Sequence, residues 1–80
     1  MSPTVLRQDG FTFAIYANDH PPAHVHVKQA ENDARIRLGP VEVLHNEGFN
    51  DRELSKIVSI VRDNLGLFLA RWNSYHPEAR

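Results

Sequence analysis

The sequence predicts an α+β domain, in which an antiparallel sheet of four or five strands packs against one long C-terminal helix. Two patterns predict this class. The first half of the chain alternates apolar and polar residues in short runs separated by turn residues, which is typical of strands. Residues 51–75 carry apolar side chains at helical spacing. A length of 80 residues indicates a single domain over residues 1–80 with a modest core.

The strands of the predicted sheet are separated by clear turn signals. Asp9-Gly10 favours a two-residue hairpin, because both positions tolerate a positive φ. Residues 18–22 form a loop that contains two prolines, and Gly39-Pro40 ends the next hairpin. The expected strands cover residues 4–7, 11–16, 24–29 and 34–38, with a short fifth or edge strand at 41–44 and a turn at 45–48.

Alternation also predicts how the third and fourth strands pair, because the apolar residues of both must share one face. The expected pairs are Val25 with Leu38 and Val27 with Ile36 on the core face, and Lys28 with Arg35 and His26 with Arg37 on the other face. Directly opposed cations destabilise a sheet by roughly a few tenths of a kcal/mol. This face is therefore expected to bind an anion, approach a carboxylate or lie in solvent.

The C-terminal third of the chain has the signature of a capped amphipathic helix. Asn50 is the expected N-cap, Glu53 its capping-box partner, and Phe49 packs onto Leu54. The apolar stripe consists of Leu54, Ile57, Val58, Val61, Leu65, Phe68, Leu69 and Trp72. Its continuity predicts one helix from about Asp51 to Tyr75, although Gly66, off the stripe, could mark a break into two.

Composition narrows the classes of function. The chain has no cysteine, which excludes disulfides and thiolate chemistry. It has no apolar run of the roughly 20 residues that span a membrane and no signal peptide, so a cytoplasmic location is expected. Nine basic and ten acidic residues leave a formal charge of -1, which disfavours an extensive phosphate footprint. Because the core is small, pairing with another chain, including a homodimer, is a further expectation.

The most informative motif is His20-Pro21-Pro22-Ala23-His24-Val25-His26-Val27, which holds three of the five histidines. In a strand, His24 and His26 would point to the same face. The two prolines stiffen the preceding turn and restrict how His20 approaches that strand. Three titratable rings beside a rigid turn suit either metal binding or proton transfer near neutral pH.

One interpretation of this motif is a ribonuclease-like site. Cleavage of RNA needs a general base, a general acid and cations around the phosphate. His20, His24 and His26 would lie at the centre of such a site, with His24 and His26 transferring protons. Lys28, Arg35 and Arg37 would bind the phosphate from the same face of the sheet.

A second interpretation makes His20, His24 and His26 the ligands of a divalent metal ion, with water in an open fourth position. The Cα atoms of alternate strand residues lie ~7 Å apart, so the two rings can meet at one ion. Asp19 or Glu42 would orient a ligand ring or act as a base. The ribonuclease-like interpretation needs no cofactor. The motif alone therefore does not decide whether the chain binds a metal ion or whether it is an enzyme.

A third interpretation is a non-catalytic protein-interaction module, in which the helix or an edge strand binds a partner. The histidines would then tie the loop to the sheet, and Glu42 would form an ion pair with Arg35 or Arg37. His45 is assigned to a turn, His76 to a frayed helix end, and Trp72 to the core.

Several segments resemble the bacterial domain of unknown function 4160 family. They are Pro3-Thr4-Val5-Leu6, Phe13–Tyr16, Asp19-His20 with the following Pro21-Pro22 and His24-Val25-His26-Val27, Pro40–Leu44, Asn46-Glu47-Gly48-Phe49 and Trp72-Asn73. Members of that family are often encoded beside proteins of the domain of unknown function 2442 family, in an arrangement similar to a type II toxin-antitoxin pair. The resemblance therefore implies a small bacterial effector that is bound by a cognate antitoxin-like protein.

Overall fold

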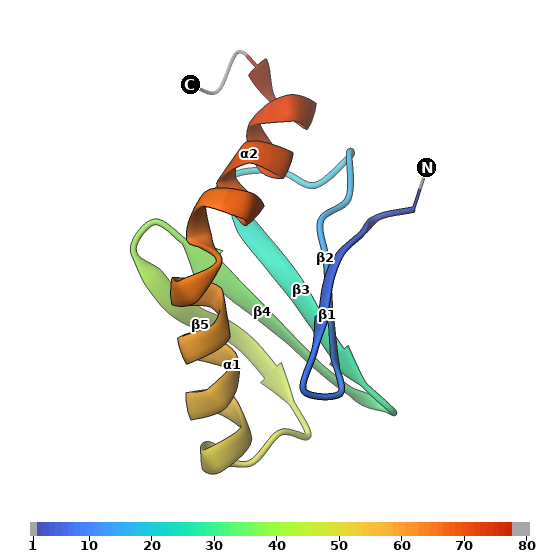
Figure 1. Ribbon diagram of the computed structural model, residues 1–80, viewed down its shortest axis with the longest axis vertical. Coiled ribbons are helices and arrows are strands. Elements are labelled where there is room, and N and C mark those ends of the chain that lie inside the picture. The colour runs from blue at the N-terminus through green and yellow to red at the C-terminus, as the bar shows by residue number, and fades with distance from the viewer. Residues whose placement is uncertain (1, 78–80) are drawn as a thin grey trace.

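The computed structural model describes residues 2–77 as a five-stranded sheet covered on one face by two helices (Figure 1). The elements are β1 (Thr4–Gln8), β2 (Phe11–Ala14), β3 (His24–Gln29), β4 (Asn32–Leu38), β5 (Val41–Glu47), α1 (Asp51–Asp63) and α2 (Leu65–Tyr75). The strands follow the chain order β1-β2-β3-β4-β5, and every neighbouring pair is antiparallel. The predicted α+β class with an antiparallel sheet is confirmed.

The β1–β2 and β3–β4 hairpins both close through two-residue turns. Gln8 pairs with Phe11, and the intervening Asp9 and Gly10 have φ values of 54° and 85°, as predicted. The β3–β4 hairpin is tighter than predicted, since Gln29 pairs with Asn32. Its turn is Ala30-Glu31, so β4 begins two residues earlier than the sequence pattern suggested. The predicted turn at 45–48 is also wrong, because β5 continues through His45 to Glu47.

The tight turn changes the register between β3 and β4 from the predicted one. Val25 pairs with Ile36, and Val27 pairs with Ala34, a shift of two residues along β4. A shift of two keeps every side chain on its predicted face, but it changes the partner of each residue. The observed polar pairs are Lys28 with Asp33, His26 with Arg35 and His24 with Arg37. The predicted contact between two cations at Lys28 is therefore replaced by one between opposite charges.

The C-terminal segment forms two helices, so the prediction of one long helix is wrong. The break is at Asn64, which leaves the helical conformation at φ -119° and ψ 22°. Its side-chain Nδ2 donates to the carbonyl oxygen of Ile60 at 2.8 Å, a bond that competes with regular helix continuation. Gly66 lies inside α2. The start of α1 matches the prediction, since Asn50 and Glu53 form both hydrogen bonds of a capping box.

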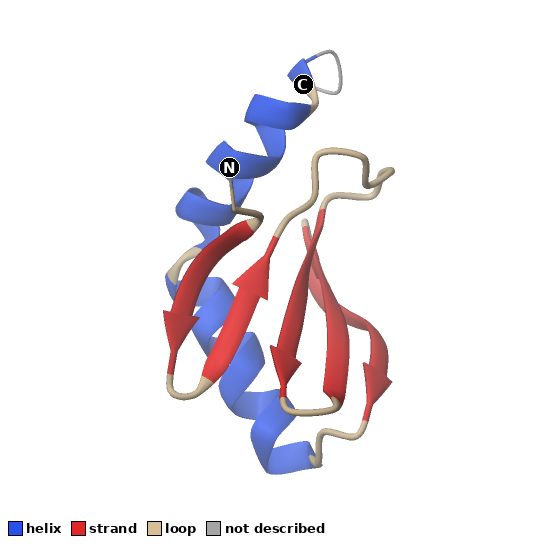
Figure 2. Cartoon of the chain, turned by 90° about the vertical axis from the view of Figure 1, so that its right-hand side faces the viewer, coloured by secondary structure: helices blue, strands red, loops and turns tan. Residues whose placement is uncertain are grey.

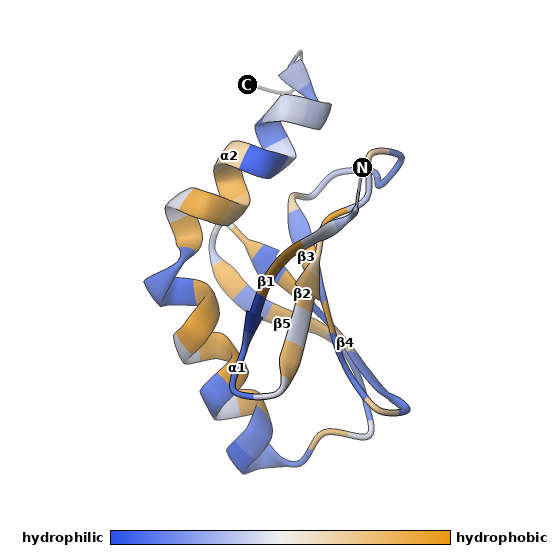
Figure 3. Cartoon of the chain, turned by 45° about the vertical axis from the view of Figure 1, so that its right-hand side comes forward, coloured by the Kyte–Doolittle hydropathy of each residue, from blue (hydrophilic) through white to orange (hydrophobic). Residues whose placement is uncertain are grey.

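The core lies between the helices and one face of the sheet, as Figure 2 makes plain from the side. Two ring contacts link the layers: Phe13 meets Phe68 at 5.6 Å between centroids, and Phe11 meets Phe49 at 5.8 Å. Apolar and polar segments alternate along α1 in Figure 3, consistent with a helix buried on one side. Among the described residues, no helix is long and apolar enough to cross a membrane. Beyond the strand ends, α2 continues towards the β2–β3 loop (Figure 2).

Candidate metal centre

Two of the clustered histidines meet an aspartate where the β2–β3 loop enters β3. The Oδ2 atom of Asp19 lies 3.0 Å from Nε2 of His26 and 3.6 Å from Nε2 of His24. All three ligand atoms lie within 4.8 Å of one another. The group, here called the Asp19 triad, therefore consists of Asp19, His24 and His26.

Local hydrogen bonds bring the aspartate back over the strand. The backbone N–H of Asp19 donates to the carbonyl oxygen of Tyr16 at 3.1 Å, which closes a turn. The backbone N–H of Tyr16 in turn donates to Asp19 Oδ2 at 3.3 Å. His24 and His26 share one face because they alternate in β3, as predicted. The loop and the strand together bring three potential ligands, one carboxylate and two imidazoles, close to one another.

The hydrogen-bond partner of His24 determines which ring nitrogen is free. Its Nδ1 atom lies 2.8 Å from the carbonyl oxygen of Pro22. A carbonyl oxygen only accepts, so Nδ1 must carry the hydrogen that it donates. In the neutral ring, Nε2 then holds a lone pair, and this is the atom that faces Asp19. A histidine that donates from one nitrogen to a carbonyl and presents the other is the usual form of a metal ligand.

The triad is largely removed from solvent. The His24 side chain is 10% exposed, and those of His26 and Asp19 are each 18% exposed. Burial lowers the pKa of His26 from its ordinary value of 6.5, although the Asp19 carboxylate acts in the opposite direction. The neutral imidazole, which is the form that binds a metal, is therefore favoured at neutral pH.

Aromatic rings surround the two histidines. The rings of His24 and His26 lie 5.0 Å apart, and Tyr16 meets His26 edge-on at 4.9 Å. Trp72, from α2, is tilted against His24 at 5.4 Å. Trp72 is 3% exposed, so its assignment to the core is confirmed. These rings limit the rotation of both histidines and exclude water from one side of the triad.

His20, the first histidine of the motif, is exposed and lies outside the group of ligand atoms in the described part of the chain. The two prolines turn the chain between His20 and His24, and Asp19 occupies the place that the sequence pattern assigned to His20. The structure thus brings together two of the three predicted histidines. Asp19, which the sequence suggested only as a supporting residue, is in direct reach of both.

The three predicted anion-binding cations lie on the polar face of β3 and β4, and two of them face acidic residues across the strands. Arg37 forms an ion pair with Glu42, one of the alternatives predicted for that carboxylate, and its Nε donates to the carbonyl of Pro40 at 3.3 Å. Lys28 is exposed opposite Asp33. Arg35 is exposed between His26 and His45 on the neighbouring strands. Of the three, Arg35 is the one that pairs with no acidic residue across the strands.

His76 is the residue that the sequence pattern placed least well. It was assigned to a frayed helix end, but its Nε2 atom lies 2.6 Å from the carbonyl oxygen of Asp19, and its Nδ1 atom lies 3.0 Å from that of Trp72. The ring stacks on Trp72 at 4.0 Å with an interplanar angle of 14°. The spacing of Trp72 and His76 by one helical turn was a visible signal, but nothing local connects either residue to Asp19.

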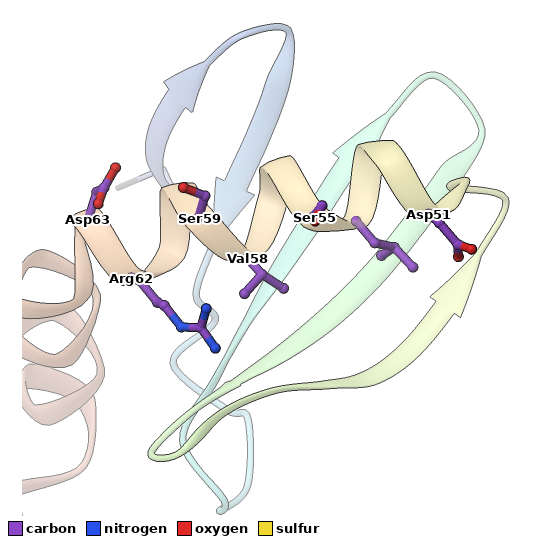
Figure 4. A pocket seen from close by; sticks show the side chains of 7 residues that line it. Asp51, Ser55, Val58, Ser59, Arg62 and Asp63 are labelled. Carbon is purple, nitrogen blue, oxygen red and sulfur yellow. The ribbon is translucent and has the colours of Figure 1, made fainter.

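A second group with ligand-like geometry lies on the polar face between β4 and β5. It consists of Asp33, His45 and Glu47, whose ligand atoms also lie within 4.8 Å of one another. The side chains of His45 and Glu47 are 39% and 75% exposed, so water competes strongly there. A surface pocket on the outer side of α1 contains none of these histidines (Figure 4). It is lined by Asp51, Leu54, Ser55, Val58, Ser59, Arg62 and Asp63.

Comparison with known proteins identifies a family. A family model described as a domain of unknown function, DUF4160, matches residues 10–73, which include the β2–β3 loop, all of the Asp19 triad and Trp72. Neither the curated proteins nor the solved structures contain a match to this chain.

Proposed function

Since the chain belongs to the DUF4160 family, a family of domains of unknown function, we propose its function from the geometry of the Asp19 triad. The function is the binding of one divalent transition-metal ion by Asp19 Oδ2, His24 Nε2 and His26 Nε2. Zn²⁺ fits this set of ligands best. This reading keeps two of the three ligands predicted from the sequence and replaces His20 by Asp19.

The observation that carries the proposal is the 3.6 Å approach of His24 Nε2 to Asp19 Oδ2. Because Nδ1 donates to Pro22, a neutral His24 directs a lone pair at a carboxylate oxygen. Two acceptor atoms repel each other at this separation, and a metal ion between them would make the approach favourable. Separations of 3.0 and 3.6 Å from the same carboxylate oxygen bracket the spacing of about 3.3 Å expected between ligand atoms around tetrahedral zinc.

The ligand types favour zinc over the hard cations. Two imidazole nitrogens and one carboxylate oxygen suit Zn²⁺ and the neighbouring transition metals, whereas Mg²⁺ and Ca²⁺ prefer oxygen ligands throughout. Three protein ligands leave one tetrahedral position for water or for an atom of another molecule, as in catalytic zinc sites. The aromatic rings of Tyr16 and Trp72 would restrict access to that position from their sides.

Calorimetric titration of Zn²⁺ into protein without a histidine tag tests the proposal. We expect one ion per chain for the wild type, and loss of binding for Asp19→Ala, His24→Ala and His26→Ala. The matched control is His20→Ala, because His20 lies in the same loop but outside the triad. A titration without saturable heat would contradict the proposal, and so would an equal loss of affinity in the His20→Ala control.

A protonated His24 is the competing explanation of the short approach, because an imidazolium would donate from Nε2 to Asp19. The same titration separates the two explanations. Zinc must displace a proton from a protonated His24 but none from a neutral one, so a binding heat that depends on the ionisation enthalpy of the buffer would identify the protonated ring. If the histidine is protonated and the site binds no metal, no such heat is produced.

The predicted action on RNA stays a prediction. In that reading His24 and His26 transfer protons, and Arg35, which lies directly opposite His26, is the cation best placed to bind a phosphate. This second function would be supported if the wild type cleaved RNA in the presence of a chelator and the His24→Ala/His26→Ala double variant did not. The cognate antitoxin-like partner, the homodimer and the cytoplasmic location also stay predictions.

A further inference from the structure

We infer that His76, at the end of α2, is a positioning residue that holds the Asp19 carboxylate over the two histidine ligands. The inference rests on the proposed metal function, which it deepens by adding a residue from the far end of the chain. Within residues 2–77, His76 has no hydrogen bond or ring contact with His24 or His26. It acts through the backbone of Asp19 and through the ring of Trp72.

The contact between His76 and Asp19 is short and connects distant parts of the chain. Nε2 of His76 lies 2.6 Å from the carbonyl oxygen of Asp19, across 57 residues of sequence. The side chain of Asp19 extends from this backbone position to His26 and His24. A hydrogen bond at the carbonyl therefore limits rotation of the backbone that aims the carboxylate.

Contacts of both its ring and its backbone hold His76 in place. Its Nδ1 atom faces the carbonyl oxygen of Trp72 at 3.0 Å, and its face stacks on the Trp72 ring. The backbone N–H of His76 also donates to the carbonyls of Trp72 and Asn73, at 3.1 and 3.2 Å. A carbonyl oxygen only accepts, so Nε2, which has the shorter of the two contacts, donates to Asp19.

Trp72 connects His76 to His24, a second proposed metal ligand. Its ring stacks on His76 on one side and meets His24 at 5.4 Å on the other. The end of α2 thus contacts both Asp19 and His24, which are the two groups whose mutual approach carries the metal proposal. Residues that orient metal ligands in this way typically change metal affinity by roughly 10- to 100-fold when they are replaced.

The test compares zinc affinity in three variants that differ at the end of α2. His76→Phe keeps a ring to stack on Trp72 but removes both nitrogens, and we expect its zinc affinity to fall by roughly 10- to 100-fold at unchanged stoichiometry. His76→Gln keeps an N–H group near the position of Nε2 and should recover most of the affinity. Ser74→Ala is the matched control, because the exposed Ser74 hydroxyl donates within its own helix, to the carbonyl oxygen of Arg71.

The outcomes separate this inference from the proposed function. If the wild type binds no zinc, both fail. If the wild type binds zinc and His76→Phe binds it equally well, only the role of His76 is overturned. It is likewise overturned if His76→Phe, His76→Gln and Ser74→Ala all lose affinity alike, since that pattern would mean general fraying of the helix.

A measurement on the wild type keeps the inference testable if His76→Phe does not fold. Because coupling between two sites is reciprocal, a metal held by Asp19 should stabilise the contact with His76. Zinc should therefore slow hydrogen exchange of the His76 backbone amide. An exchange rate unchanged by saturating zinc would overturn the positioning role.

Discussion

Nε2 of His24 and Oδ2 of Asp19 face each other at 3.6 Å, while Nδ1 of His24 donates to the carbonyl oxygen of Pro22. The pair forms because the turn at Tyr16 folds Asp19 back over the start of β3. His26 reaches the same oxygen from two residues further along the strand. All three ligand atoms therefore come from residues 19–26, so an ion bound there would join the loop to the sheet.

Zinc should raise the thermal stability of the protein, because it binds the folded triad and not the unfolded loop. At a free concentration near 100 times the dissociation constant, the expected gain is about 2.7 kcal/mol, or roughly 10–20 °C in melting temperature for a domain of this size. Thermal unfolding followed by circular dichroism measures it. Asp19→Ala should show no such shift, and an equal shift in that variant would place the ion elsewhere.

The metal-free protein should lose stability as the pH falls below neutral. Burial holds the pKa of His26 below its ordinary value of 6.5, so the unfolded chain binds this proton more readily than the folded one. The contribution of His26 to the free energy of unfolding is therefore full above about pH 6.5 and decreases as the pH falls from that value through the lower pKa of the folded state. Urea unfolding across this range measures the slope. His26→Gln should have a shallower slope, and identical slopes would contradict the assignment.

Phe68 should be among the most costly positions to truncate. Its side chain is fully buried and packs against Phe13 across the two layers. Phe68→Ala should lower the free energy of unfolding by about 3–5 kcal/mol, because it removes buried area and leaves a cavity. The neighbouring Leu67 is 46% exposed, so Leu67→Ala should cost much less. Equal losses in urea unfolding would show that α2 does not pack as described.

Two glycines should respond to alanine with opposite signs. Gly48 has a φ of 103°, and a Cβ there would collide with the Asn32 side chain, so Gly48→Ala should destabilise the fold by about 1–3 kcal/mol. Gly66 lies in α2 with open space around the position of a Cβ. Gly66→Ala should therefore stabilise the protein by about 0.5–1 kcal/mol. Chemical unfolding of both variants checks the pair, and a shared sign would contradict the assigned backbone conformations.

Much of the sheet could be predicted because its signals are local. Asp9-Gly10 specifies its own turn, and alternation places His24 and His26 on one face whatever the pairing. The register could not be predicted in the same way, because a shift of two residues leaves every face unchanged. The Ala30-Glu31 turn selects the register, and neither residue is a strong turn signal.

The helix break and the site depended on contacts that the apolar pattern does not contain. The stripe continues from Ile57 through Trp72 across both helices, so it gives no sign of the bond between Asn64 and Ile60. The sequence pattern singled out His20, His24 and His26, but the geometry of the loop decides that Asp19, and not His20, lies beside the other two. His76 contacts Asp19 across 57 residues of sequence, so no local sequence pattern predicts that contact.

An anomalous difference map from crystals grown with one equivalent of zinc would locate the bound ion. We expect one peak about 2.0–2.2 Å from each of Asp19 Oδ2, His24 Nε2 and His26 Nε2, as the proposed zinc site requires. A peak at Asp33, His45 and Glu47, a peak at His20, or no peak at all would contradict it.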